Sequence, residues 1–281
     1  MNQVMIASLM SSLRGQSVPD ENLIRHMVLN SLRTNRRKFK DKFGEMIIAC
    51  DDTNYWRKQV FPYYKASRKK SREKSPLDWN SIFLILNKIR EEIKDNFPYP
   101  VIRVKSAEAD DIIASFCHEN GRQLGGDPIL ILSGDKDFMQ LQKYSNVHQY
   151  DPVRKRFLEC SDPAKYLVEH ILRGDTGDGV PNFLSSDDTF VSGTRQRQLR
   201  QTLIDQILIT NGPEDWPGMT EELRRNYHRN RMLIDLTQVP NNIREEVRQQ
   251  YEDQSDKDRS KLFNYFIKNK LKHMMENISE F

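Results

Sequence analysis

The chain has 281 residues, of which 37% are hydrophobic and 30% are charged, so it can bury a sizeable core in one large domain or a main domain with a satellite. No apolar run approaches the roughly 18–20 residues that span a bilayer, which argues against a membrane protein. The three cysteines form no CxxC pair, so a zinc site or a disulfide framework is not expected and a reducing cytosol fits better. The first 15 residues lack the basic segment of a secretory signal, and we interpret them as helix.

The net charge of +4 is small, but the basic residues are unevenly distributed along the chain. Residues 25–42 contain seven Lys or Arg side chains against one acid, and residues 57–74 contain eight against one. The acidic residues gather elsewhere in short clusters. Basic side chains that hold a polyanion, together with separate acids that hold metal ions, are what an enzyme acting on phosphodiesters needs.

Up to about residue 155, short apolar runs alternate with amphipathic segments, which predicts an α/β fold with a central, mostly parallel sheet. Asp20 is expected to cap the second helix, with Leu23, Met27 and Leu32 on its apolar side. In chain order, the predicted elements are helices at 3–14 and 21–40, a strand at 45–50, a helix at 77–95, a strand at 101–104, a helix capped by Ser106, a strand at 128–132, a helical segment at 138–142 and a strand at 147–150.

Beyond residue 155 the pattern becomes helical, and we see no internal repeat. We therefore predict an α/β catalytic domain at 1–155 and a helical domain at 156–281. The turn-rich stretch at 174–188 is the least regular part of the second half. The predicted helices of this half are 163–172, 195–210, 219–235, 242–250 and 258–276.

Acidic side chains follow three of the predicted strands. The three groups are Asp51 with Asp52, then Glu108 with Asp110 and Asp111, and then Asp135 with Asp137. Because ligands bind beyond the carboxyl ends of parallel strands, we expect these groups to meet at one edge of the sheet. Clustered carboxylates repel one another and acquire raised pKa values unless cations intervene. Oxygen ligands select hard ions, so Mg²⁺ or Mn²⁺ is predicted.

A fourth acidic group lies in the loop 174–179, whose sequence is GDTGDG. Gly177 and Gly179 allow the backbone to approach a phosphate closely, and Asp178 is placed to close the metal site from outside the sheet. Each acidic group alone has an ordinary explanation as a helix cap, a solvated turn or a favourable charge at a helix N-terminus. The prediction of a metal site therefore depends on four groups in register with the strand ends.

Residues 55–70 interleave aromatic rings with cations. Rings stack on unpaired bases while Lys and Arg side chains follow phosphates, which predicts a site for single-stranded nucleic acid. The alternative is a solvated basic helix with two or three buried rings, and residues 33–42 are interpreted in that way. The predicted nucleic-acid-binding residues of the stretch are Arg57, Lys58, Tyr64, Lys65, Arg68, Lys69 and Lys70.

Six motifs in order along the chain are similar to those of the flap endonuclease and 5′-nuclease superfamily, and within it to the ribonucleases H of T-even bacteriophages. They are IIACDD, YWRKQVFPYYKASRKK, SAEADDIIASF, LSGDKDFMQL, RGDTGDGVPN and NRMLIDLTQVP. The ending YFIKNKLKHMMENISEF also resembles the phage enzymes. The resemblance covers nearly the whole chain, and EADD followed by SGDKDF and then GDxGD is a specific signature.

The resemblance implies a PIN-like 5′-nuclease domain followed by a helical domain, in which a helix–loop–helix around Gly174–Pro181 binds duplex DNA. It implies a 5′→3′ exonuclease and flap endonuclease that removes RNA primers from lagging-strand fragments and leaves 5′-phosphate ends. Two Mg²⁺ ions are implied, with Mn²⁺ as a substitute. The implied partners are branched or nicked DNA, RNA–DNA duplexes with a 5′ single strand, the phage single-strand-binding protein and the sliding clamp. A monomer in the cytoplasm of the infected host is expected.

The resemblance also assigns roles to individual residues. Arg57 and Lys65 fall in the region that contacts the scissile phosphate and forms an arch over the single strand, and Asp175 gives outer support to the metal site. The implied metal-site acids are Asp51, Glu108, Asp110, Asp111, Asp135, Asp137 and Asp178. The implied catalytic residues are Asp51, Asp110, Asp135, Asp137, Arg57 and Lys65.

The sequence departs from the family pattern in two places. Family members begin with a strand that ends in Asp, and this chain starts at Met1, just past that position, so one central strand and one metal ligand are expected to be missing. We interpret Met1 as an internal methionine, because losing a central strand would leave sheet backbone groups unpaired; a truncated product is the alternative. Residues 182–194 replace the compact glycine-rich turn of cellular relatives, so a potassium-assisted grip on duplex is not predicted.

Two other functions compete with the nuclease. The missing first Asp motivates a protein that binds flaps or junctions in DNA but has lost catalysis. The other hypothesis is a different metallonuclease with the same sheet topology, such as a toxin-like ribonuclease. The long helical second half and the basic aromatic stretch argue against this hypothesis.

Overall fold

The computed structural model describes residues 20–68, 75, 77–121 and 126–281, and the predicted helix at 3–14 lies outside this part of the chain. In the labels below, η marks a 3-10 helix. In chain order the elements are α2 (Glu21–Phe43), β1 (Ile48–Ala49), α3 (Arg57–Val60), α5 (Trp79–Asn96), β2 (Val101–Ile102), α6 (Ala109–Gly121), β3 (Ile129–Leu132), η1 (Lys136–Lys143), β4 (Val147–Asp151), β5 (Arg156–Leu158), α7 (Pro163–Arg173), α8 (Thr189–Ser192), α9 (Gln201–Leu208), η2 (Pro213–Asp215), α10 (Glu221–Ile234), η3 (Leu236–Gln238), α11 (Asn241–Glu252), α12 (Leu262–Lys268), α13 (Lys272–Glu276) and η4 (Ile278–Glu280).

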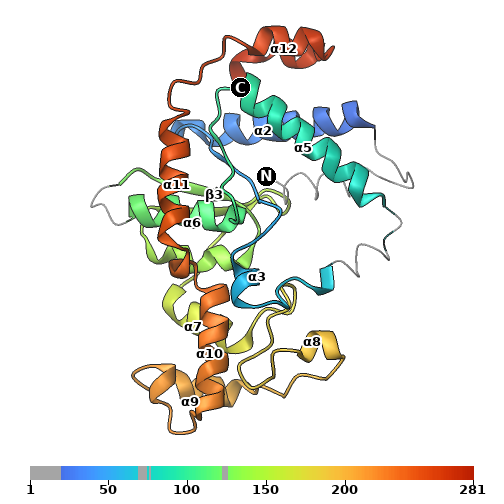
Figure 1. Ribbon diagram of the computed structural model, residues 1–281. Coiled ribbons are helices and arrows are strands. Elements are labelled where there is room, and N and C mark those ends of the chain that lie inside the picture. The colour runs from blue at the N-terminus through green and yellow to red at the C-terminus, as the bar shows by residue number, and fades with distance from the viewer. Residues whose placement is uncertain (1–19, 69–74, 76, 122–125) are drawn as a thin grey trace.

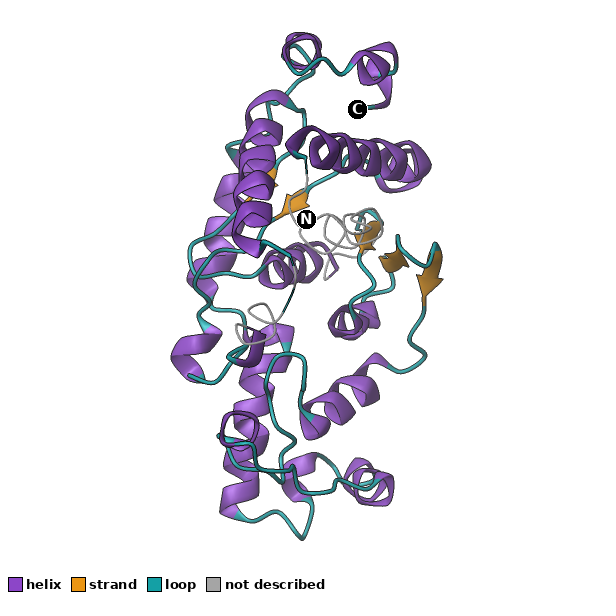
Figure 2. Ribbon diagram, turned by 90° about the vertical axis from the view of Figure 1, so that its right-hand side faces the viewer, coloured by secondary structure: helices purple, strands orange, loops and turns teal. Residues whose placement is uncertain are grey.

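The strands of the described residues form two small sheets, seen as two orange groups in Figure 2. β1 and β2 are parallel, β3 and β4 are parallel, and β5 joins β4 in the antiparallel direction. The predicted mixed α/β fold with parallel strands is confirmed, but the strands are shorter than predicted and divided between two sheets. β5 was not predicted because two of its three residues are exposed and it has no buried apolar run.

Helix α2 begins after Asp20, whose side chain accepts a hydrogen bond from the backbone N–H of Asn22, and this predicted cap is confirmed. Of the predicted apolar positions, Leu32 packs against the core as expected but Leu23 is 40% exposed, and the buried side of the helix is formed by Ile24, Val28 and Leu29. These residues pack with β1, β2, α5, α12 and Phe281 in one core cluster. The helix ends at Gly44, whose φ of 74° is a conformation that favours glycine.

The predicted cap at Ser106 is wrong. Ser106 has a φ of 64°, its backbone N–H donates to Asp52, and helix α6 begins three residues later at Ala109. The side chain of Asp111 instead reaches back to the backbone N–H of Glu108 at 2.9 Å, which is half of a capping box. The result is that the first turn of α6 starts within the acidic motif itself.

The second half is helical, as predicted, with two differences. Residues 195–200 have no regular secondary structure, so the helix predicted at 195–210 begins only at α9. The helix predicted at 258–276 is broken into α12 and α13, with Lys270 at a φ of 54° between them. Helix α10 packs on α3 and α7, and α11 packs on α6, so helices of the second half contact elements of the first half. No helix of the described residues is long and apolar enough to cross a bilayer.

Candidate active site

The carboxyl ends of the strands meet the N-terminus of α6, as the sequence predicted. Asp51, which follows β1, accepts a hydrogen bond of 2.8 Å from the backbone N–H of Ala109 in the first turn of α6. Asp110 stands next in that turn. Burial raises the pKa of Asp110 well above its ordinary value, and the negative charges of Asp135 and Glu108 raise it further. Acids from the ends of different strands therefore come within electrostatic reach of one another.

Asp135 and Asp137 are positioned by the start of η1. The side chain of Asp135 accepts from the backbone N–H of Asp137 at 3.1 Å, and its own N–H donates to the hydroxyl of Ser133. Burial raises the pKa of Asp137 to about 7, opposed by His170 and reinforced by Asp135. Such a carboxyl group favours a cation beside it, because a cation removes the cost of burying its charge.

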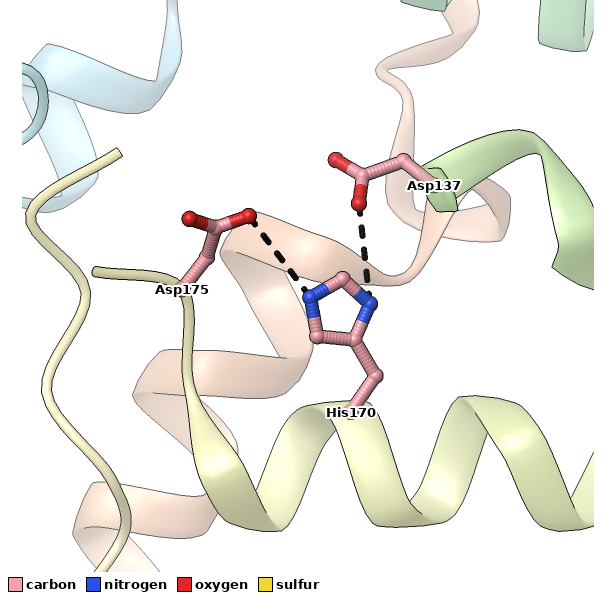
Figure 3. Close-up of side chains that lie close together, drawn as sticks. All are labelled: Asp137, His170 and Asp175. Atoms are coloured by element: carbon pink, nitrogen blue, oxygen red, sulfur yellow. Dashed lines mark ion pairs between the residues drawn. The ribbon is translucent and has the colours of Figure 1, made fainter. Parts of the chain in front are cut away.

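Asp137, His170 and Asp175 form the only group of three His, Cys, Asp or Glu residues in the described part of the chain whose possible ligand atoms all lie within 4.8 Å of one another. The imidazole of His170 stands between the two carboxylates, as Figure 3 shows. Its Nδ1 is 3.6 Å from Oδ1 of Asp137, and its Nε2 is 3.6 Å from Oδ2 of Asp175. The sequence analysis missed His170, because a single His near the end of a helix carries no spacing signal.

The three side chains of this group shift one another's protonation. Burial disfavours the imidazolium, but the carboxylates of Asp175 and Asp137 raise the pKa of His170 above its ordinary value. His170 in turn lowers the pKa of Asp175 below its ordinary value, helped by the backbone N–H of Asp178. In the absence of a metal ion, the two carboxylates therefore favour the protonated, positively charged form of His170.

Glu108 and Asp178 are neutralised by the basic aromatic stretch. Glu108 is 2% exposed and accepts from the Tyr64 hydroxyl at 2.9 Å and from Lys65. The same hydroxyl oxygen also lies 2.9 Å from the Asp178 carboxylate, so its one proton serves either acid, and Lys65 Nζ lies 3.3 Å from the Asp178 carboxylate. Arg68 is the third partner of Asp178. Two of the predicted metal-site acids are thus joined by one tyrosine and one lysine.

The loop 174–180 is held against the same stretch. The backbone N–H of Lys65 donates to the carbonyl of Asp178 at 2.7 Å. Gly179 has a φ of 73°, and a Cβ atom there would lie 3.2 Å from the carbonyl oxygen of Tyr63. In this structure the glycine therefore allows close approach of protein backbone, where the sequence analysis predicted approach to a phosphate. Gly177, the other predicted glycine, is exposed.

Arg57 is a buried structural cation in this conformation. It is 2% exposed, and its guanidinium contacts Glu108 and Asp111 at 2.8 Å each and donates to the carbonyl of Leu233 at 2.9 Å. Burial opposes the charge, but Asp111 and Glu108 raise the pKa of Arg57 above its ordinary value. The predicted contact of Arg57 with a scissile phosphate stays a prediction, and in this conformation the guanidinium supplies the paired cation that buried acids require.

Asp111 is fully buried, and its Oδ2 accepts from the indole Nε1 of Trp56 at 3.1 Å and from the backbone N–H of Glu108. Its Oδ1 accepts no hydrogen bond from the described residues and is paired only by charge with the Arg57 guanidinium at 2.8 Å. Asp110, one residue earlier, is half-buried. Adjacent acids of one motif therefore have different surroundings, one closed by donors and one beside other acids.

The predicted nucleic-acid-binding side chains differ in exposure. Lys58 is exposed and Arg68 has 45% of its side chain exposed, whereas Tyr64 is 3% exposed and packs in a core with α7, α9 and α10. Tyr63, beside it, is 37% exposed. Lys69 and Lys70 lie outside the described residues.

The basic helix α2 is partly an internal ion-pair surface. Arg25 pairs with Glu92 of α5, and Arg36 pairs with Glu45. Both of these arginines are buried. Other cations of α2, such as Arg37 with 69% of its side chain exposed, face solvent as predicted.

Known proteins share this fold and these motifs. A model described as 5′-3′ exonuclease, N-terminal resolvase-like domain, matches residues 10–170, and one described as T4 RNase H, C terminal, matches residues 163–281. Ribonuclease H of Enterobacteria phage T4 is 31% identical over 288 residues, covering 100% of this chain and 93% of that protein. Flap endonuclease Xni of Shewanella oneidensis is 28% identical over 175 residues, covering 59% of this chain and 62% of the relative.

A solved structure of the bacteriophage T5 D15 flap endonuclease, in a pseudo-enzyme–product complex with DNA and metal ions, has a TM-score of 0.59 at 15% identity. The match covers 90% of this chain and 97% of that one and shows a common fold. With acids gathered at the strand ends, with matches that together span residues 10–281 and with a phage relative along its whole length, the chain belongs to the 5′-3′ exonuclease family and is a nuclease of the T4 ribonuclease H type.

Proposed function

We propose that the chain is a Mg²⁺-dependent 5′→3′ exonuclease and flap endonuclease that hydrolyses phosphodiesters in RNA–DNA and DNA duplexes. The observation that carries the proposal is Asp110, a half-buried acid within electrostatic reach of Asp135 and Asp137. Such a set of oxygen donors fits hard divalent ions. The names of the relatives, ribonuclease H and flap endonuclease, support the substrate class and the cut at 5′ ends.

Two Mg²⁺ ions, for which Mn²⁺ substitutes, would be held by the acids at the strand ends. They supply an activated water and neutralise the charge of the reacting phosphate. The chain itself keeps those acids in position. The backbone N–H of Ala109 donates to Asp51, and the first turn of η1 positions Asp137. Tyr64 and Lys65 each contact both Glu108 and Asp178. The acids proposed to hold the ions are Asp51, Glu108, Asp110, Asp135, Asp137 and Asp178.

Substrate contact in the proposal falls to exposed side chains. Lys58 and Arg68 are placed to follow the phosphates of a 5′ single strand, and the partly exposed ring of Tyr63 is placed to stack on a base. Lys65 stands deeper, with 10% of its side chain exposed, between Glu108 and Asp178. Arg57 is assigned a positioning role, because it fixes Glu108 and Asp111.

We further propose the biological setting that this activity fits. The substrates are branched or nicked DNA and primer RNA on lagging-strand fragments, in the cytoplasm of an infected host, with the phage single-strand-binding protein and sliding clamp as partners. A monomer with a catalytic part at 1–155 and a helical part at 156–281 is proposed. The loop around Gly174–Pro181, which follows α7, would belong to the duplex-binding helix–loop–helix. The complex of the T5 flap endonuclease with DNA supports a nucleic-acid substrate for this fold.

The test uses the purified full chain with a 5′-flap DNA and an RNA–DNA duplex in Mg²⁺. We expect short products released from the 5′ end, with 5′ phosphates on the cut strand. Asp110→Asn should lower the rate by about 10²-fold or more, because it removes charge that stabilises the reacting state. Flap affinity measured in the same buffer should change little, because exposed cations supply it.

Asp95→Asn is the matched control, since Asp95 is an exposed acid of α5, and this variant should keep the wild-type rate. Full activity of Asp110→Asn would move the active site elsewhere. Tight flap binding without cleavage in either Mg²⁺ or Mn²⁺ would replace the nuclease by the binding-protein alternative.

A further inference from the structure

We propose that His170 is a metal ligand, and that one ion of the proposed nuclease centre binds to a mixed nitrogen and oxygen site that prefers Mn²⁺ to Mg²⁺. The inference rests on the proposed function only in placing a metal ion near Asp137. It adds a nitrogen donor, from a helix of the second half, to a set that the sequence predicted to be entirely carboxylates.

The spacing of the three side chains is the first support. Nδ1 of His170 lies 3.6 Å from Asp137 and Nε2 lies 3.6 Å from Asp175. The Nδ1–Asp137 separation is too long for an N–H···O hydrogen bond, whose usual limit is about 3.2 Å. Two atoms that each bind one ion at about 2.0–2.2 Å are roughly 3 Å apart at a right angle and roughly 3.4 Å apart at a tetrahedral angle. The 3.6 Å between Nδ1 and Asp137 is therefore nearer to the tetrahedral spacing of two ligands on one ion than to the length of a hydrogen bond.

The unsatisfied nitrogen is the second support. Nδ1 of His170 is buried from solvent and has no hydrogen-bond partner among the described residues, and 14% of the whole side chain is exposed. A buried polar atom without a partner costs stability and calls for an explanation. An ion bound between Nδ1 and Asp137 would give the imidazole nitrogen a partner and would also give the carboxylate a neutralising cation.

The second nitrogen has the neighbour that metal-binding histidines usually have. A histidine that ligates a metal commonly directs its other ring nitrogen at a carboxylate, which fixes the tautomer and the ring orientation. Nε2 of His170 is directed at Asp175 in this way, as Figure 3 shows. Asp175, which the sequence analysis placed as outer support for the metal site, would then orient the nitrogen ligand.

The fold holds the imidazole in place before any ion binds. His170 lies in the last turn of α7, and its carbonyl accepts the backbone N–H of Gly174, which ends the helix. The next two residues, Ile171 and Leu172, are buried and fix the rotation of the helix about its axis. Asp175 is held by two backbone hydrogen bonds with Val180, of 2.7 and 2.9 Å. Little conformational freedom is left to lose when a ligand arrives.

The nature of the donors sets the preference among ions. Carboxylate oxygens suit Mg²⁺ and Mn²⁺ alike, whereas an imidazole nitrogen suits transition metals and is a poor ligand for Mg²⁺. Removing the imidazole should therefore weaken Mn²⁺ binding by about 10–100-fold, the scale seen when a group that supports a metal ligand is lost. Mg²⁺ binding should change by much less, so the ratio of the two affinities should fall.

The experiment detects the nitrogen directly. The full chain is loaded with Mn²⁺, and electron spin echo envelope modulation measures ¹⁴N coupled to the ion. We expect modulation from a coordinated imidazole in the wild type and a changed frequency when the protein is made with ¹⁵N-histidine. This isotope comparison needs no substitution and so does not depend on any variant folding.

His170→Gln should lose the modulation and bind Mn²⁺ more weakly. His228→Gln is the matched control, because His228 also has a carboxylate 3.6 Å from Nε2, that of Glu214, but both side chains are largely exposed. This control should keep the signal. Bound Mn²⁺ without histidine modulation in the wild type, or an unchanged signal in His170→Gln, would overturn the inference.

The two proposals fail separately in this design. Flap cleavage in Mg²⁺ by a protein that shows no histidine coupling would leave the nuclease in place and remove His170 as a ligand. Histidine coupling in a protein that cleaves no substrate would do the reverse. The spectroscopic result therefore decides the ligand without reference to activity.

Discussion

The acids around the strand ends fall into two groups with opposite surroundings. Glu108, Asp111 and Asp178, the paired acids, each contact a cation of the basic aromatic stretch. Asp110 and Asp137, the open acids, have pKa values raised by burial and by neighbouring acids, with His170 as the nearest opposing group of Asp137. In the metal-free protein, cations of the chain therefore neutralise the paired acids, whereas burial and neighbouring acids still disfavour the charge of the open acids.

This difference shows what the basic aromatic stretch does in the fold. Its cations and rings look from the sequence like a surface for nucleic acid. Arg57 and Tyr64 are instead buried, where they neutralise and connect acids from α6 and from the loop after α7. The remaining exposed members, such as Lys58 and Arg68, are the ones left for substrate.

The largest expected effect comes from removing the cation of the paired acids. Arg57→Met should lower the free energy of unfolding by about 3–5 kcal/mol, because it leaves Glu108 and Asp111 buried without their shared partner. Urea unfolding followed by circular dichroism measures the loss. Arg37→Met is the control, since Arg37 is exposed and pairs with Glu280 at the surface, and it should cost less than about 1 kcal/mol. Equal losses of unfolding free energy in both variants would contradict the claim that the paired acids depend on the Arg57 cation.

The sequence predicted the positions of the open acids well because their signal is local. Each follows an apolar run that forms a strand, and strand ends of parallel pairs meet on one side. The same locality explains the correct cap at Asp20, whose acceptor and donor are two residues apart. Features set by two or three neighbouring residues can be read from one chain.

The features that could not be predicted from the sequence depend on contacts between residues far apart in the chain. Tyr64 meets Asp178 across 114 residues, and Arg57 meets Glu108 across 51, so nothing near either residue distinguishes a buried partner from a phosphate. His170 becomes notable only because η1 and the loop after α7 bring Asp137 and Asp175 to its two nitrogens. β5 was missed because it is held by pairing with β4 and not by burial of its own side chains.

Adding a divalent metal tests the open acids next. Mg²⁺ at about 100 times its dissociation constant should stabilise the chain by about 2.7 kcal/mol, because the ion binds only the folded form. Thermal unfolding with Mg²⁺ or with EDTA measures the shift. Asp110→Asn should reduce this gain and, without metal, should raise stability above the wild type, because it removes a charge that burial disfavours. A metal-free Asp110→Asn protein less stable than the wild type would contradict the description of Asp110 as open.

A smaller loss is expected from the connection between the paired acids. Tyr64→Phe removes the hydroxyl that lies 2.9 Å from both Glu108 and Asp178 and donates its proton to one of them, and it should cost about 1–2 kcal/mol of unfolding free energy. Its Mg²⁺-induced stabilisation should stay near the wild-type value, since Lys65 still joins the two acids. Tyr63→Phe provides the matched control on the neighbouring, partly exposed ring. If Tyr64→Phe lost the Mg²⁺-induced stabilisation and Tyr63→Phe did not, the paired acids and the open acids would have to be treated as one metal-binding group.

The smallest effect is a pH dependence confined to the open acids. The folded-state pKa of Asp137 is raised to about 7, above its unfolded value, so the folded form binds the proton more tightly. Stability from this group is therefore complete at low pH and is lost as pH rises through 7. Between pH 6 and pH 8, without metal, the wild type should lose about 1 kcal/mol relative to Asp137→Asn, as the linkage relation requires for one proton with this pKa. Saturating Mn²⁺ should abolish the difference in slope between the two proteins, because a bound ion takes the place of the proton. A slope that persists in Asp137→Asn would assign the titration to another group, with His170 the first to examine, since its raised pKa gives a loss of the same sign.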